Sequence, residues 1–236
     1  MATPTGRRTG RPRAVTEQAI LDAALAQLDA GGPAAVSVRG IAGQVGVAPN
    51  AVYTYFPSKA AVLRALVERF LGDVNHDRLV DRQLPWRQRV EALALELRTH
   101  LVAHPGAVQL LLGGLMGGPN ALALRESLNE VLADAGSTPD DAARASYVLL
   151  VYVLGAIALE VAELDQPHTT PTERTRVSTR RAVLDTISAD TYPRTTETAA
   201  TISKDLTTEQ FLWGLTRILD GLEPDSPRQD QPAGSR

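Results

Sequence analysis

The apolar and polar positions of residues 1–70 predict a series of helices. Between about residues 16 and 30, apolar side chains recur at intervals of three and four, and Thr16 is placed to cap the first turn. This stripe consists of Ile20, Leu21, Ala24, Leu25 and Leu28. Gly31-Gly32-Pro33 follows it and predicts the end of the helix.

Two shorter helices are predicted next, joined at a glycine. The first begins after Ser37 and ends at Gly46, because glycine adopts the left-handed turn that ends many helices most easily. The second begins at Pro49, whose missing N–H would have no partner in a first helical turn, and ends near Phe56-Pro57. A fourth helix then begins at Ser58. Short helices joined in this way indicate a helix-turn-helix at about residues 37–56, within a domain of residues 15–72.

The rest of the chain also has a helical pattern. No alternation of period two is sustained enough to predict a strand, so we expect an all-α protein with a larger helical bundle at about residues 80–222. Threonine, arginine and proline dominate residues 166–201, which predicts a mobile connection with one short helix near 180–187. Residues 223–236 are predicted to be a disordered tail. The predicted bundle helices cover about residues 86–101, 107–116, 121–135, 139–164 and 207–222, and Thr138 and Thr207 are predicted to cap the last two.

Two of the bundle helices carry unusually wide apolar faces. The first contains no charged residue between Tyr147 and Leu159, so it is either the central helix of the core or meets a second subunit on one side. The helix that follows Thr207 is similar. Pairing both with their symmetry mates would form the four-helix interface of a homodimer. The residues predicted for this interface are Tyr147, Val151, Leu154, Leu212, Leu215 and Leu219.

Charge is distributed unevenly between the two predicted domains. Residues 1–70 carry eight basic and four acidic side chains, a net charge of +4, so the remaining residues carry −7 of the total of −3. This division is typical of a phosphate-binding module attached to a body that does not bind DNA, although uneven scatter of surface charge would look the same. Residues 1–14 are predicted to be a flexible basic arm. Its Arg11 and Arg13 fit a narrow DNA minor groove, but a solvated tail explains them equally well.

Composition excludes several classes of protein. The hydrophobic share of 44% and the charged share of 22% are typical of a globular chain that folds without metal or disulfide support. The absence of cysteine excludes disulfides, thiolate metal sites and cysteine nucleophiles, and makes the cytoplasm the natural compartment. No uninterrupted apolar run of about 18 residues and no apolar leader are present, so we expect neither secretion nor a membrane span. No nucleotide, dinucleotide or serine-hydrolase motif supports an enzyme or a cofactor.

Residues 16–70 carry a long, ungapped signature. Its segments are Val36-Ser37-Val38-Arg39-Gly40-Ile41-Ala42, Val45-Gly46-Val47-Ala48, Val52-Tyr53-Thr54-Tyr55-Phe56-Pro57-Ser58-Lys59 and Leu63. These segments resemble the TetR family of transcriptional regulators. Asn50 departs from the glycine that is frequent there, but asparagine tolerates unusual turn geometry and can bond to a base edge.

The short length of the third helix and the resemblance together assign roles within the helix-turn-helix. Pro49, Asn50, Ala51 and Thr54 would reach base edges in the major groove, while Val52 and Phe56 would be core. By resemblance, Tyr53 and Tyr55 would place their hydroxyls on phosphates, with aromatic packing between helices as the alternative. Lys59 would hold the DNA backbone, and Ser37 and Arg39 complete the predicted DNA contacts.

The body resembles the tetracycline-repressor-like C-terminal domain over about residues 85–222, in segments that include His104-Pro105-Gly106-Ala107 and Leu154-Gly155. That resemblance implies a bundle that dimerises and binds a small-molecule effector. Gln109 and Leu110 stand where the tetracycline repressor has its metal-binding histidine, so the sequence gives no support for tetracycline. The predicted pocket residues, for each of which plain core is the favoured alternative, are Trp86, Val90, His104, Gln109, Met116 and Tyr152.

A histidine pair invites a metal interpretation. His100 and His104 would share one face of a helix, but Leu101 stands where the catalytic zinc pattern needs glutamate and no third ligand is nearby. We therefore predict no metal site and interpret the pair as solvated or capping.

These patterns together predict a DNA-binding transcriptional repressor that a small-molecule ligand releases from double-stranded operator DNA. Two alternatives stay open from the sequence. One is an activator or non-inducible regulator with the same DNA-binding module, and the other is a helical interaction protein that does not bind DNA.

Overall fold

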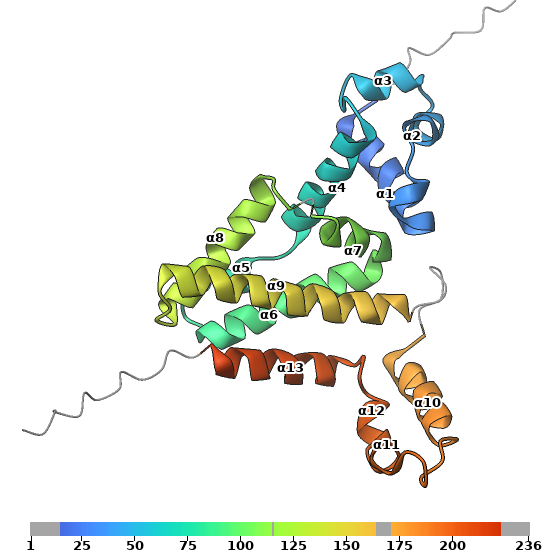
Figure 1. Ribbon diagram of the computed structural model, residues 1–236. Helices are drawn as coiled ribbons and strands as arrows, with labels where there is room; N and C mark the ends of the chain where they lie inside the picture. The colour runs from blue at the N-terminus through green and yellow to red at the C-terminus, as the bar shows by residue number, and fades with distance from the viewer. Residues whose placement is uncertain (1–14, 115, 164–170, 223–236) are drawn as a thin grey trace, which may run out of the picture. The chain divides into compact units, whose positions relative to one another are not determined.

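The computed structural model describes residues 15–114, 116–163 and 171–222. The described residues form helices and no strands, which confirms the predicted all-α fold (Figure 1). The chain divides into two compact units, residues 1–66 and residues 67–236, so the boundary falls inside α4. The helices are α1 (Glu17–Ala35), α2 (Val38–Val45), α3 (Pro49–Tyr53), α4 (Lys59–Asp73), α5 (Asp77–Val80), α6 (Trp86–Ala103), α7 (Pro105–Leu112), α8 (Pro119–Asp134), α9 (Pro139–Ala162), α10 (Glu173–Leu184), α11 (Pro193–Glu197), α12 (Ala199–Ile202) and α13 (Thr208–Gly221).

The first unit begins with a capped helix that is kinked near its end. The Thr16 hydroxyl accepts a hydrogen bond of 3.2 Å from the amide of Ala19, as the sequence predicts. The backbone then leaves helical geometry at Gly31 and Gly32, and Gly32 has a positive φ of 68°. The helical backbone is therefore interrupted where the sequence predicts its end, but the short segment 33–35 continues beyond the kink and α1 ends at Ala35.

The turn between α2 and α3 has the predicted form. Ser37 caps α2 by accepting a hydrogen bond of 3.1 Å from the amide of Gly40. Gly46 ends the helix in the left-handed conformation, with φ 74° and ψ 32°. Its amide bonds back to the last turn of α2, which satisfies carbonyls that would otherwise lack partners. Ile41 and Val52 are fully buried on either side of this turn, so the turn holds α3 at a fixed place on the unit.

Replacing Gly46 by alanine should lower the free energy of unfolding by about 1 kcal/mol, because a side chain at positive φ is strained. A Cβ atom at Gly46 would meet no atom within 4 Å, so the backbone conformation alone decides the result. Gly43→Ala is the matched control, since Gly43 also has open space but lies inside α2, where alanine should add about 0.5–1 kcal/mol. Urea unfolding of the full chain measures both, and changes of the same sign would contradict this explanation.

The second unit is built around α9. This helix contacts α6, α7, α8 and α13 (Figure 1). Its start has the predicted signature, because the Thr138 hydroxyl accepts a hydrogen bond of 3.2 Å from the amide of Asp141. By length and composition alone α9 could cross a membrane, but Leu149, Val153 and Ile157 are buried against the neighbouring helices of the same unit. These contacts are typical of the central helix of a bundle.

The segment after α9 is more helical than the sequence predicted. Instead of one short helix near residues 180–187, α10 covers Glu173–Leu184, and α11 and α12 follow before residue 203. The prediction was wrong because α10 has almost no apolar stripe. Charged contacts replace that stripe, since Arg176 is buried and Arg180 lies 3.2 Å from a carboxylate oxygen of Glu163.

A buried carboxylate joins α10 to the bundle. Glu160, on α9, is only 4% exposed. Arg98, on α6, donates from Nε to Oε2 at 2.7 Å and from Nη2 to Oε1 at 2.8 Å. Arg176, on α10, donates to the same Oε1 at 2.6 Å. Charge-assisted bonds of this kind are short and directional, so Glu160 fixes three helices relative to one another.

A second carboxylate extends this group to α13. Glu173 accepts hydrogen bonds of 3.0 Å from both the amide and the hydroxyl of Thr208. Burial alone would raise the pKa of Glu173, but the bonds from Thr208 and the charges of Arg98 and Arg176 outweigh burial and lower that pKa. The carboxylate is therefore held in its charged form at the first turn of α13, where the helix dipole also favours an anion.

Candidate nucleic-acid interface and effector cavity

The residues predicted to contact base edges lie on α3 or directly after it. Pro49, Asn50 and Thr54 are exposed and Ala51 is half-buried, whereas Val52 is fully buried. Phe56 is also buried, at 6% exposed. The polar and small side chains of α3 and of Thr54 directly after it therefore face solvent, while Val52 and Phe56 anchor this segment to the unit. A helix of this length, open on one side, is suited to entering a DNA major groove.

The two tyrosines that follow have different surroundings. Tyr53 is 50% exposed and Tyr55 is 42% exposed. The Tyr55 hydroxyl donates a hydrogen bond of 2.6 Å to the carbonyl oxygen of Val15. The hydroxyl proton of Tyr55 is therefore donated within the unit, whereas the sequence predicted that this hydroxyl would contact a phosphate. The contact joins residues 40 positions apart, and no local pattern in the sequence could have indicated it.

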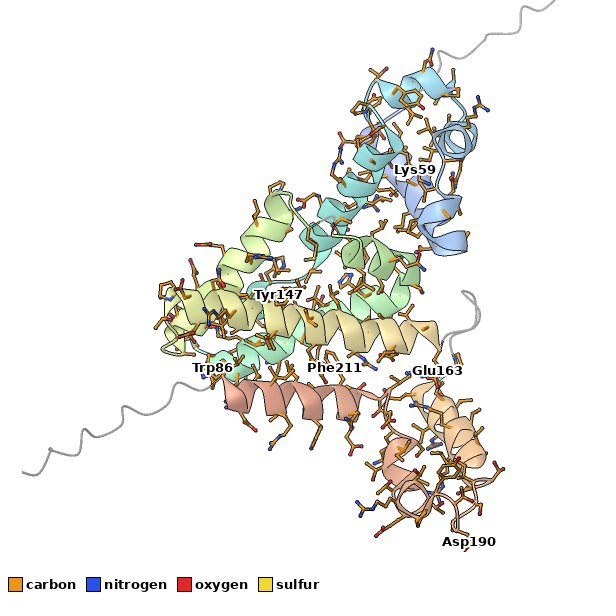
Figure 2. The ribbon with its side chains drawn as sticks, viewed as in Figure 1. Lys59, Trp86, Tyr147, Glu163, Asp190 and Phe211 are labelled. Carbon is orange, nitrogen blue, oxygen red and sulfur yellow. The ribbon has the colours of Figure 1, made fainter. Side chains whose placement is uncertain are left out.

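The remaining predicted DNA contacts are placed by the ends of α2 and α4. Arg39 is exposed in the first turn of α2. Lys59 is half-buried and is the first residue of α4 (Figure 2). The preceding residue, Ser58, caps this helix, because its hydroxyl accepts a hydrogen bond of 3.2 Å from the amide of Ala61. Within the described residues, no side chain forms an ion pair with Lys59 or Arg39. Arg11 and Arg13 lie outside the described residues.

Sequence reasoning missed one positioning residue. The Gln27 side-chain oxygen, on α1, accepts a hydrogen bond of 3.0 Å from the amide of Ser37. A Cβ atom on Gly40 would lie 2.9 Å from that oxygen and 2.8 Å from the Ser37 hydroxyl. Gln27 therefore fixes the start of α2 against α1, and the lack of a side chain at Gly40 makes the contact possible. Ser37 acts here as a cap, whether or not it also contacts DNA.

The second unit contains an apolar cavity between α6, α8 and α9. Its volume is about 70 Å³, measured as space open to the centre of a water molecule. Only Arg125 and Ser146 among its lining residues are polar. The apolar lining consists of Val90, Leu93, Ala94, Leu97, Met116, Ala121, Leu124, Leu128, Leu149, Leu150 and Val153. An apolar site with few polar groups is typical of a small-molecule site.

Two of the six predicted pocket residues, Val90 and Met116, line this cavity. The other four do not. Gln109 is exposed on α7, and Trp86 lies half-buried at the start of α6 (Figure 2). The Tyr152 hydroxyl donates a hydrogen bond of 2.7 Å to the carbonyl oxygen of Phe211, which turns Tyr152 toward α13. His104 contacts Phe70 edge to face, with ring centroids 5.7 Å apart.

The histidine pair surrounds the same aromatic ring. His100 also contacts Phe70 edge to face, at a centroid distance of 5.9 Å, and its Nε2 lies 3.1 Å from Oε1 of Glu96. Within the described residues, no three histidine or carboxylate side chains are grouped so that they could hold a metal ion. The pair therefore packs around the buried Phe70 of α4.

The predicted dimer residues divide between the surface and the core. Tyr147 is 63% exposed and Val151 is 53% exposed on α9 (Figure 2). In contrast, Leu154, Leu215 and Leu219 are covered by the unit itself and are not available to a partner. The periodicity of an all-apolar helix could not distinguish the two faces. Three further exposed apolar residues extend the surface, namely Val148 and Leu159 on α9 and Trp213 on α13.

The contact between α4 and α8 is very close. The Glu68 side chain accepts a hydrogen bond of 2.7 Å from the amide of Asn120, and the Asn120 side-chain amide donates one of 2.7 Å to the carbonyl oxygen of Glu68. A Cβ atom on Gly118 would overlap the Glu68 side chain, and one on Gly72 would lie 2.7 Å from the Asn120 amide. Two glycines thus allow the last turns of α4 to sit against the start of α8, directly before the cavity residue Ala121.

Comparison with known proteins gives consistent matches. Residues 20–66 match the family model described as bacterial regulatory proteins, tetR family, and residues 81–225 match the model described as tetracyclin repressor-like, C-terminal domain. An HTH-type transcriptional regulator of Saccharopolyspora erythraea is 31% identical over 62% of this chain, and the match spans 61% of that relative's length. The HTH-type transcriptional repressor DrrR1 of Streptomyces coeruleorubidus is 28% identical over 93% of this chain and 82% of its own.

A solved structure shares the fold over most of the chain. The TetR family protein ActR of Streptomyces coelicolor, in complex with (S)-DNPA, superposes with a TM-score of 0.70. The two sequences are 21% identical, and the superposition covers 89% of this chain and 98% of ActR. At that identity the likeness concerns the arrangement of helices.

Proposed function

Because the chain belongs to the tetR family of bacterial regulatory proteins, as the sequence predicted, we propose that it is a DNA-binding transcriptional repressor that a small-molecule ligand releases from its operator. The observation that carries this proposal is the geometry of α3. Asn50 of α3 and Thr54 directly after it are exposed, and the Gly46 turn and the buried Val52 fix the segment that presents them. The repressor name of DrrR1 and the ligand complex of ActR support the same function.

Gel-shift titration with the promoter region beside the chain's own gene tests the proposal. We expect retardation at moderate salt that an excess of scrambled duplex does not abolish, because specific sites are typically bound about 10³-fold or more tightly than non-specific DNA. Absence of retardation, or equal retardation of the scrambled duplex, would overturn the proposal. A search for compounds that abolish retardation then separates a ligand-released repressor from an activator or a non-inducible regulator.

Residues proposed to contact bases and residues proposed to contact phosphates should respond differently to substitution. Asn50→Ala should change the preference between operator variants, with a cost of about 1–3 kcal/mol at one base pair, since it removes a base contact. Lys59→Ala should weaken binding to all duplexes by a similar factor, since it removes a phosphate contact. It should also reduce the magnitude of the slope of log K against log salt concentration by about one. Fluorescence anisotropy over a panel of duplexes and salt concentrations measures both. Equal effects of the two substitutions across the panel would contradict the assignment.

We also propose that the working form is a homodimer formed through the exposed apolar stripe of α9 together with Trp213 of α13. Both helices keep large apolar side chains in water in the isolated chain, and apolar patches of this kind mark interfaces. A twofold dimer presents two α3 helices, which can contact adjacent major grooves about 34–36 Å apart. This function would place the protein in the cytoplasm with its operator.

The contact between α4 and α8 offers a physical route from ligand to DNA. α4 begins in the first unit at Lys59 and ends in the second at Asp73. Asn120 holds α4 through Glu68, and the next residue, Ala121, lines the cavity. A ligand that displaces the start of α8 would therefore displace α4 as well. Only a ligand with different affinity for the DNA-bound and released states would change operator binding in this way.

A further inference from the structure

The cavity between α6, α8 and α9 has one unusual polar group. Arg125, on α8, is an exposed residue that nevertheless lines an otherwise apolar cavity. Resting on the proposed function, we propose that the effector is an anionic amphiphile, an apolar chain that carries a carboxylate, and that Arg125 binds the carboxylate at the mouth of the cavity.

Arg125 differs from the other arginines near this site. Arg89 and Arg98 are committed to carboxylates within the unit, Arg89 to Asp134 at 2.8 Å and Arg98 to Glu160 at 2.7 Å. No described side chain forms an ion pair or a hydrogen bond with Arg125. The helix itself offers none, because the residues three and four positions away are Ala121, Leu122, Leu128 and Asn129. The guanidinium is therefore available to a ligand.

The second polar group of the cavity cannot replace Arg125. The Ser146 hydroxyl donates a hydrogen bond of 2.6 Å to Oδ1 of Asn129. Since its only proton is used there, the hydroxyl oxygen can accept a hydrogen bond but cannot donate one to a carboxylate. No acidic side chain lines the cavity. The charge and the hydrogen-bonding capacity of the lining both favour an anion at Arg125 and disfavour a cation.

Burial determines how the ligand is oriented. A carboxylate placed among Leu97, Leu149 and Val153 would lose its hydration without a partner, at a large energetic cost. At Arg125 the carboxylate keeps contact with water, while the apolar chain occupies the interior. The small volume, about 70 Å³, favours a slim, unbranched chain over fused rings.

Matched eight-carbon probes test this inference. We expect octanoate to bind the wild-type chain about tenfold more tightly than 1-octanol or octylamine, because only the carboxylate gains charge-assisted hydrogen bonds from Arg125. Affinity should rise from hexanoate to octanoate, by up to about fourfold for each methylene that becomes buried. Isothermal titration calorimetry at pH 7 measures both. The inference would be overturned if octanol or octylamine bound as tightly as octanoate.

Two arginine variants locate the carboxylate. Arg125→Gln should remove the advantage of octanoate over octanol and leave octanol binding unchanged. Arg144→Gln, at an exposed arginine of α9 that does not line the cavity, should keep the advantage. The assignment of Arg125 would be overturned if the Arg125→Gln variant bound octanoate as tightly as the wild type does. Far-ultraviolet circular dichroism checks that both variants are folded.

Gel shifts with the same probes separate this inference from the proposed function. If octanoate binds through Arg125 but promoter DNA stays bound, the cavity binds this class of ligand, but the inference that such a ligand is the effector is overturned. If promoter DNA is bound specifically but octanoate has no advantage over octanol, the inference fails alone and the DNA-binding proposal stands.

Discussion

Replacing Glu160 by alanine should lower the free energy of unfolding by about 3–5 kcal/mol, because it removes the carboxylate that lies nearest to two buried arginines. The side chains of Arg98 and Arg176 are only 14% and 6% exposed, and both direct guanidinium nitrogens at the Glu160 carboxylate. Their charges would then remain in a poorly solvated place. We expect the loss to appear in guanidinium chloride unfolding of the full chain as a lower midpoint.

A surface ion pair provides the control for this prediction. Arg181 and Asp185 lie on consecutive turns of α10, 2.8 Å apart, with side chains 43% and 53% exposed. Asp185→Ala should change stability by only about 0.3–0.5 kcal/mol, since water screens exposed pairs. Equal losses in the two variants would show that Glu160 does not organise a buried group, and that α10 is held to the bundle in another way.

Val151→Glu should convert the homodimer to a monomer and weaken operator binding by about 10²–10⁴-fold, because two linked recognition helices bind far more tightly than one. Val151 is 53% exposed, so a charge there does not disturb the core of the unit and acts on the proposed interface alone. Light scattering coupled to size-exclusion chromatography gives the mass, and fluorescence anisotropy gives the operator affinity.

The matched control is Val183→Glu on α10. Val183 is equally apolar and 62% exposed, but it lies outside the proposed stripe of α9 and α13. This variant should remain dimeric and bind the operator as the wild type does. A dimeric Val151→Glu variant with full operator affinity would contradict the interface.

Local signals in the sequence were sufficient for the ends of many helices. Ser37, Gly46 and Thr138 act within a few residues, through caps and through a left-handed turn, and the structure has them as predicted. The first residue of α13 is likewise preceded by the predicted cap, Thr207. A strong apolar stripe was sufficient for α1, α6, α8 and α9, although their ends differ by a few residues from the prediction. The all-α fold followed from these local patterns, and the family followed from the resemblance of residues 16–70 to its signature.

Non-local contacts explain what the sequence did not predict. α10 was mostly missed because its stability comes from ion pairs with α9, such as that between Arg176 and Glu160, and not from a stripe of its own. Tyr152 was assigned to the pocket because it is aromatic and near the centre of α9, but Phe211 of α13 determines its direction. Arg125 has no sequence signal at all, because only the packing of three helices brings it to the cavity.

DNase I footprinting on the promoter region beside the chain's own gene tests the central claim most directly. We predict two protected half-sites related by a twofold axis, with centres one helical turn or a multiple of it apart, about 10–10.5 base pairs per turn. The protection should disappear in the Val151→Glu variant at concentrations that saturate the wild type. Lack of protection, or uniform protection along the whole fragment, would contradict the account of this chain as a dimeric, operator-specific repressor.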